Sequence, residues 1–193
     1  MPDALSDLSP RLIIVTGRPG SGKTTLAHAL ARAIRCPAIC RDEIKEGLVH
    51  SLSAASEPTD AVQRHATDAF FQAIQTLLQN GVTLVAEAAF QHRIWAPRLE
   101  PLFALARPRL IVCGVDPELA RSRHIERALA DPQRERFHPD PLLTAAREGR
   151  PLPTATYDPP KLDVPTLVVD TTSDYVPPLA EIISFAREPL QSH

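Results

Sequence analysis

The sequence predicts an α/β fold in which a parallel sheet of five strands carries helices on both faces. Short apolar stretches recur between longer stretches with helical periodicity, which is typical of a doubly wound parallel sheet. A glycine-rich loop at residues 17–24 also stands between the first apolar stretch and the first helical one. The 193 residues are enough for one such core, so we predict a single domain over residues 1–193.

The first predicted strand, Arg11–Thr16, has a continuous apolar centre, as a strand buried on both faces requires. The glycine-rich loop follows it and leads into a helix predicted at Lys23–Arg35. The later strands are also short apolar runs, and they are predicted at Ala38–Cys40, Val82–Ala86, Arg109–Val115 and Thr166–Val169. The later helices are predicted at Asp42–Leu52, Thr59–Gln79, Ile94–Ala106, Pro117–Ala130 and Pro178–Arg187.

Residues 131–165 differ from the rest of the chain because they are rich in Pro and Arg and show little periodicity. Proline at this density interrupts helices and strands alike. Long irregular segments in compact domains are usually functional lids or linkers. Since a strand and a helix are predicted after this segment, we interpret it as a lid or substrate flap within the one domain.

The loop Gly17-Arg18-Pro19-Gly20-Ser21-Gly22-Lys23-Thr24 has the spacing of a P-loop. Its glycines allow a tight turn in which successive backbone N–H groups point at phosphates, and the following helix adds a partial positive charge at its N-terminus. Lys23 can reach the β- and γ-phosphates, and the Thr24 hydroxyl is placed to bind Mg²⁺. The loop therefore predicts a site for a nucleotide and Mg²⁺.

Composition limits the remaining classes of function. The net charge of −2 provides no overall field that would attract nucleic acid, and no apolar run approaches the roughly 20 residues that span a bilayer. The polar N-terminus argues against a secretory signal, and three cysteines fit a reducing cytoplasm. We interpret Cys36 and Cys40 as small apolar residues around a strand, because no second pair follows to complete a metal site.

Two carboxylates follow predicted strands, at the edge of the sheet where ligands of such folds bind. Asp42 is a candidate general base, and its alternative role is to cap the next helix. Glu87 is a candidate for orienting Mg²⁺ or binding the acceptor, and its alternative is a salt bridge with Arg93. Arg41 either holds the acceptor or is a solvated strand-end residue, and Arg93 is a candidate for lining the acceptor pocket.

Arginines are concentrated in one part of the chain, with nine of them between residues 107 and 150. Arg123 and Arg127 are four residues apart on a predicted helix, so they share a face and can neutralise charge on a transferring phosphoryl group. Arg134 and Arg136 follow in the predicted flap. The alternatives are a solvated face paired with acidic neighbours and a codon bias toward Arg. Thr171, after the last predicted strand, is a candidate for bordering the base of the nucleotide.

Together these residues resemble a family of small P-loop kinases, most closely the AAA-domain kinases and also the polynucleotide kinase, chloramphenicol phosphotransferase and zeta-toxin types. The loop and the Thr25-Leu26-Ala27 that follows it are similar to theirs nearly throughout, and Arg41-Asp42 resembles the Arg-Asp pair of polynucleotide kinases. The resemblance implies a three-layer fold with strand order 2-3-1-4-5, ATP as donor, Asp42 as general base, and Arg123 and Arg127 as lid arginines. Glu87 departs from it, because the family usually has Asp there, followed by polar residues.

We therefore expect an ATP- and Mg²⁺-dependent phosphotransferase that acts on a hydroxyl of a small molecule. The alternatives are a kinase for the 5′-hydroxyl of a polynucleotide, and a nucleotide-dependent switch with little transfer activity. The resemblance implies ATP rather than GTP as the donor.

Overall fold

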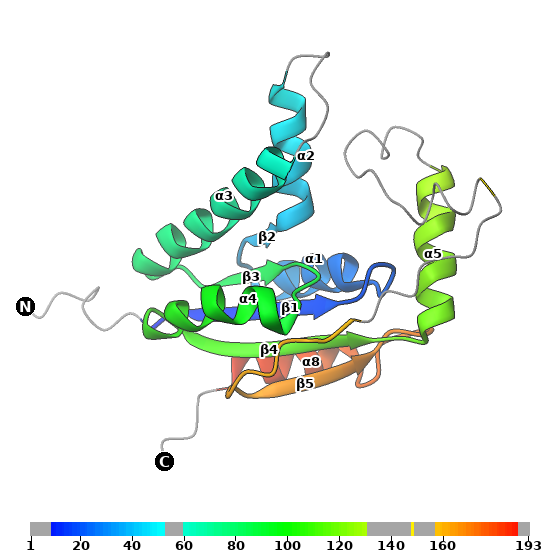
Figure 1. The fold of residues 1–193 in the computed structure, drawn as a ribbon. Helices are drawn as coiled ribbons and strands as arrows, with labels where there is room; N and C mark the ends of the chain where they lie inside the picture. Colours follow the sequence, from blue (N-terminus) through cyan, green and yellow to red (C-terminus); the bar gives the residue numbers. More distant parts are fainter. Residues whose placement is uncertain (1–8, 53–59, 131–147, 149–156, 189–193) are drawn as a thin grey trace, which may run out of the picture.

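The computed structural model describes residues 9–52, 60–130, 148 and 157–188 of the chain. These residues contain a five-stranded, fully parallel sheet in the order β2-β3-β1-β4-β5 (Figure 1). This arrangement confirms the predicted fold and strand order. The strands are β1 (Arg11–Gly17), β2 (Ala38–Cys40), β3 (Leu84–Glu87), β4 (Arg107–Gly114) and β5 (Thr166–Asp170).

The alternating side chains of β1 divide the core into two layers. Leu12 and Ile14 point to the layer formed with α3 (Asp60–Gln79), α4 (His92–Leu99) and the short 3₁₀ helix η1 (Glu100–Ala104). Ile13 and Val15 point to the layer formed with α1 (Lys23–Ile34) and α8 (Leu179–Arg187). Because successive side chains of a strand point to opposite faces, an uninterrupted apolar run is what this central strand requires.

Two further helices stand toward the carboxyl ends of the strands. α2 (Arg41–Ser51) begins directly after β2 and lies side by side with α3. α5 (Pro117–Ala130) follows β4 and lies beyond the arrowheads of β1 and β4 in Figure 1. Within the part of the chain described here, no helix is both long and apolar enough to cross a membrane.

One predicted helix differs from the structure. The sequence pattern predicts a continuous helix over Ile94–Ala106, whereas α4 ends at Leu99 and η1 continues with 3₁₀ geometry. Pro101 explains the change, because proline lacks the N–H that an α-helix needs and its ring crowds the carbonyl four residues earlier, whereas Pro97 is accommodated within α4.

The proposed flap can be followed only in part. Of residues 131–165, the structure describes residue 148 and residues 157–165, so Arg134 and Arg136 lie outside the described residues. The described end of this segment contacts the start of α4. There His92 accepts a hydrogen bond on Nδ1 from the backbone N–H of Lys161, at 3.2 Å.

Candidate active site

The glycine-rich loop links β1 to α1 at the carboxyl edge of the sheet. Gly22 is the residue that precedes α1, and its φ of 74° is in the left-handed region that favours glycine. The neighbouring Ser21 side chain is fully buried, and within the described part of the chain its Oγ has no hydrogen-bond partner. The loop thus places free polar groups at the N-terminus of a helix, which is where anions bind.

Gly20 brings this loop into direct contact with α5. Its φ is 81°, and a Cβ added there would lie 1.9 Å from the carbonyl oxygen of Ala120. No side chain fits in this space, so only glycine lets the loop and the backbone of α5 approach this closely. The contact fixes α5, and with it Arg123 and Arg127, beside the loop.

Lys23 and Glu87 meet in the interior at the ends of β1 and β3. Lys23 Nζ lies 3.6 Å from Glu87 Oε1, and both residues are almost fully buried. The register of the sheet brings them together, since Val15 pairs with Glu87 on β3. Glu87 at the end of β3 thus pairs with Lys23 at the start of α1, and not with Arg93, the partner predicted from the sequence.

Burial raises the pKa of Glu87, while Lys23 and a hydrogen bond from the Thr24 side chain act in the opposite direction. The thiol of Cys40, paired with Glu87 in the register of β2 and β3, also contacts this carboxylate. A buried carboxylate beside a threonine hydroxyl supplies two hard oxygen donors, the ligand type that Mg²⁺ prefers. Thr24 and Glu87 together therefore fit a Mg²⁺ ion.

Asp42 lies in the first turn of α2, close enough to Glu87 for its charge to raise the pKa of that carboxylate. The capping position of α2 is occupied by Cys40, so the structure does not support the alternative that Asp42 is the cap. Its side chain is 47% exposed and accepts a hydrogen bond from Arg41 Nη1 at 3.2 Å. A half-exposed carboxylate beside the phosphate loop is accessible to a substrate hydroxyl.

Hydrogen bonds to α3 hold the Arg41 side chain, which is therefore not a solvated strand-end residue. Its guanidinium donates to Gln63 Oε1 at 2.7 Å and to Thr67 Oγ1 at 3.3 Å, both on α3, and lies over the Trp95 ring. Since the same group donates to Asp42, Arg41 fixes the direction of that carboxylate. Arg41 is therefore placed to orient the carboxylate of Asp42.

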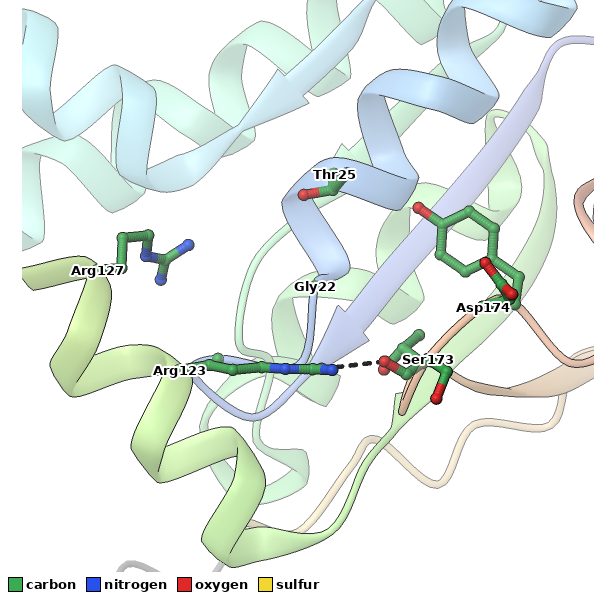
Figure 2. A pocket seen from close by; sticks show the side chains of 9 residues that line it. Gly22, Thr25, Arg123, Arg127, Ser173 and Asp174 are labelled. Carbon is green, nitrogen blue, oxygen red and sulfur yellow. Dashed lines mark hydrogen bonds between the residues drawn. The ribbon is translucent and has the colours of Figure 1, made fainter. Parts of the chain in front are cut away.

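A pocket of about 490 Å³ opens between α1, α5 and the loop after β5 (Figure 2). Arg123 and Arg127 both reach it from α5, as Figure 2 shows, and Gly22 and Thr25 border it at the start of α1. The rest of the wall comes from the loop after β5. The complete lining is Gly20, Gly22, Thr25, Arg123, Arg127, Thr171, Ser173, Asp174 and Tyr175.

Thr171 ties the loop after β5 to the phosphate loop. Its Oγ1 lies 2.7 Å from the carbonyl oxygen of Ser21 and 3.0 Å from that of Gly114. Arg123 closes the same region, donating to the carbonyl oxygens of Thr171, at 3.0 Å, and Thr172. These bonds place the guanidinium plane of Arg123 on one wall of the pocket.

Three residues near the site were not predicted from the sequence. Lys45, one turn after Asp42, is only 2% exposed. Tyr157, near the end of the predicted flap, places its hydroxyl 2.6 Å from Thr16 Oγ1, directly before the phosphate loop. Asp174 lines the pocket after β5. No motif marks these positions, although Lys45 is one of only three lysines in the chain.

Arg93 is exposed in the first turn of α4, and no contact places it at the carboxylates. One edge of the sheet thus brings together most of the predicted site residues, namely the P-loop residues, Thr25, Asp42, Glu87, Arg123, Arg127 and Thr171. Arg93 lies at the periphery of this group.

The sequence matches the AAA domain family over residues 12–148, more than two thirds of the chain. The chain therefore belongs to this family. No curated protein gives a significant match.

Solved structures share this fold. A proposed kinase from Chloroflexus aurantiacus J-10-fl is 30% identical, with a TM-score of 0.71 over 95% of this chain and 100% of that one. The APS kinase CysC of Mycobacterium tuberculosis, solved with AMPPNP and APS, is 18% identical, with a TM-score of 0.59 over 93% and 98% of the chains. A chain of the Pnkp1/Rnl/Hen1 RNA repair complex is 18% identical, with a TM-score of 0.55 over 77% and 49%.

The family match and the 30% identical kinase together support a nucleotide-dependent phosphotransferase of the P-loop kinase type.

Proposed function

We propose that this protein transfers the γ-phosphoryl group of ATP, with Mg²⁺, to a hydroxyl group of a small molecule. One observation carries the proposal. Lys23 and Glu87 are paired in the interior at 3.6 Å, with Thr24 bonded to the same carboxylate, beside a pocket that two arginines enter. This arrangement supports binding of a nucleotide triphosphate with its terminal phosphate toward Lys23.

Thr24 and Glu87 would hold the Mg²⁺ ion, which supplies neutralisation of phosphate charge when bound. Lys23 would bind the β- and γ-phosphates, and the backbone N–H groups of the loop would surround them. The Lys23–Glu87 pair then serves two purposes. It compensates both buried charges, and it leaves each in position for its own ligand.

Asp42 would accept the proton of the attacking hydroxyl. The acceptor oxygen forms a bond to the γ-phosphorus, the bond from that phosphorus to the bridging oxygen breaks, and ADP leaves with the electron pair. Arg41, bonded to both Asp42 and α3, would keep the carboxylate aimed at the acceptor. General-base assistance of this kind contributes about 10²–10⁴-fold to a rate.

The two arginines of α5 divide their roles in this scheme. The carbonyl groups of Thr171 and Thr172 already hold Arg123, and its planar guanidinium suits stacking on the nucleotide base. Arg127 is exposed, and Figure 2 shows its side chain extending toward the start of α1. We assign Arg127 to the phosphates and Arg123 mainly to the base.

A small acceptor is favoured over a polynucleotide by the residues after Glu87. Ala88 and Phe90 are buried, and the N–H of Phe90 donates to Thr16 Oγ1 at 3.0 Å. These positions pack into the core, so they offer no polar groups to a nucleic-acid strand. A chain of an RNA repair complex shares this fold, so the experiment below also includes a polynucleotide acceptor.

The decisive experiment measures transfer of labelled γ-phosphate from ATP with Mg²⁺. The acceptors are a pool of small hydroxyl compounds and, separately, 5′-hydroxyl oligonucleotides. We expect label on one small molecule, and a loss of about 100-fold or more in Asp42→Asn with nucleotide affinity nearly unchanged. Label on the oligonucleotide would favour the alternative acceptor, and release of free phosphate alone would favour the switch.

Asp68→Asn is the matched control. Asp68 lies on α3 in an exposed pair with Arg98, at 2.9 Å, and removal of such a pair changes stability by about 1 kcal/mol or less. Its transfer rate should equal that of the unmodified protein. Equal rates for Asp42→Asn and Asp68→Asn would remove Asp42 from the mechanism.

A further inference from the structure

A second cluster of potential ligands lies next to the phosphate site. His28 of α1, Cys40 at the end of β2 and Glu43 in the first turn of α2 place one ligand atom each within 4.8 Å of one another. They come from three different elements, and no sequence motif connects them. We propose that they form a binding site for a divalent transition-metal ion of the zinc type, separate from the Mg²⁺ site.

The donor set selects this class of ion. A thiolate, an imidazole and a carboxylate are the three ligand types that Zn²⁺ takes in proteins, and three protein ligands leave a fourth position for water. Mg²⁺ and Ca²⁺ prefer oxygen donors, so a sulfur ligand disfavours them. The chemistry of this cluster therefore differs from that of Thr24 and Glu87.

The two distances from His28 fit a zinc ion after small side-chain rotations, and all three ligand atoms lie within 4.8 Å of one another. Cys40 Sγ lies 3.7 Å from His28 Nε2, and tetrahedral zinc with ordinary bond lengths would separate these atoms by about 3.6 Å. His28 Nε2 lies 2.6 Å from Glu43 Oε1, where zinc would require about 3.4 Å. The side chains of His28 and Glu43 are 45% and 51% exposed, so they can rotate apart by this amount.

Access and rigidity also suit a metal site. Cys40 is buried, which fixes its sulfur, whereas the half-exposed His28 and Glu43 leave a path from solvent. The hydrogen bond between His28 and Glu43 competes only weakly with metal binding, because water can replace it when both side chains are half-exposed. The Cys40 thiol also contacts Glu87. Metal binding would therefore change the surroundings of a proposed Mg²⁺ ligand, a consequence that rests on the proposed function.

The test uses the full-length, untagged chain with its thiols reduced, and Co²⁺ as a spectroscopic substitute for Zn²⁺. We expect one ion per chain and a thiolate-to-cobalt charge-transfer band that disappears in Cys40→Ser. We also expect affinity for Zn²⁺ to fall at least about tenfold in His28→Ala and Glu43→Gln. These two residues are exposed, so their variants keep the proposal testable if Cys40→Ser folds poorly.

Cys36→Ser is the matched control, since Cys36 lies near the same strand but outside the cluster. Its cobalt spectrum should equal that of the unmodified chain. The proposal is overturned if the charge-transfer band is absent, if it depends on Cys36 rather than Cys40, or if His28→Ala and Glu43→Gln bind zinc as tightly as the unmodified chain.

Discussion

Lys45 is buried one turn after Asp42, at a cost to folding. Burial lowers the pKa of its ammonium group, while the charge of Asp42 acts in the opposite direction. We predict that Lys45→Met raises the melting temperature at neutral pH, because Met keeps the volume and removes the desolvated charge. We also expect slower phosphate transfer, since a residue that costs stability beside the proposed base is typical of a functional position.

The pH dependence follows from the lowered pKa of Lys45. Between its folded pKa and its ordinary value of 10.5, the unfolded chain binds more protons than the folded one, so stability rises with pH through that window. The advantage of Lys45→Met should therefore be full below the folded pKa of Lys45 and shrink as pH rises from there toward 10.5. The exposed Lys161→Met serves as control, and an equal gain there would contradict the prediction.

Tyr157 connects the end of the predicted flap to the base of the phosphate loop. Its half-buried hydroxyl lies 2.6 Å from Thr16 Oγ1, and partial burial raises the pKa of this phenol to about 12. Loss of one such bond in Tyr157→Phe should cost about 1 kcal/mol, which lowers the melting temperature by about 2–4 °C in a chain of this size.

A double-mutant cycle isolates that bond. Thr16→Val also removes the acceptor for the N–H of Phe90, so it should destabilise more than Tyr157→Phe. Once Thr16 is replaced, the further change of Tyr157 should have little effect on the free energy of unfolding measured in urea. Full additivity of the two changes would show that the hydroxyl groups do not interact.

At the scale of elements, the contact between the phosphate loop and α5 determines where the lid arginines stand. A methyl group at Gly20 would lie 1.9 Å from the carbonyl oxygen of Ala120, and φ there is 81°. Gly20→Ala must therefore push α5 away, together with Arg123 and Arg127. We predict at least a tenfold loss of nucleotide affinity, roughly 1.4 kcal/mol, measured by calorimetric titration.

Gly47→Ala is the matched control for this prediction. Gly47 lies within α2, and an added Cβ meets nothing within 4 Å. Alanine is the better helix former, so this variant should be more stable by about 0.5–1 kcal/mol and should bind nucleotide normally. Normal binding by Gly20→Ala as well would show that α5 does not need this contact.

The sequence predicted the elements whose signals are local. The apolar runs, the glycine spacing and the strand-end carboxylates located the sheet, the phosphate loop and Glu87. The helix after β3 was predicted too long, because apolar periodicity does not register Pro101, which follows the end of α4. Lys45 and Tyr157 were missed because their burial depends on segments far away in the chain. His28, Cys40 and Glu43 were missed because three elements must meet before they become neighbours.

At the scale of the whole molecule, the strands of one sheet are distributed along the sequence between Arg11 and Asp170, and the central strand, β1, continues into the phosphate loop. α1 begins at this loop and packs against α8, near the end of the described chain. A ligand held by the loop therefore stabilises elements from both ends of the sequence. That residues 1–193 form a single domain stays a prediction, and single-transition unfolding would support it.

Nucleotide binding should accordingly raise the stability of the whole fold. A ligand that binds only the folded chain, present at 100 times its Kd, adds about 2.7 kcal/mol, which corresponds to roughly 5–10 °C in melting temperature here. We expect this shift with Mg²⁺ and a non-hydrolysable ATP analogue, measured by differential scanning calorimetry.

Two comparisons make this measurement specific. Chelation of Mg²⁺ should reduce the shift, because Thr24 and Glu87 would lose the ion that connects them to the phosphates. Lys23→Met should lose most of the shift, since the ammonium group that faces Glu87 at 3.6 Å is then absent. Equal shifts in Lys23→Met and the unmodified chain would mean that the nucleotide binds elsewhere than at this loop. If no nucleotide shifted the melting temperature, the 490 Å³ pocket would have to bind a ligand of another kind.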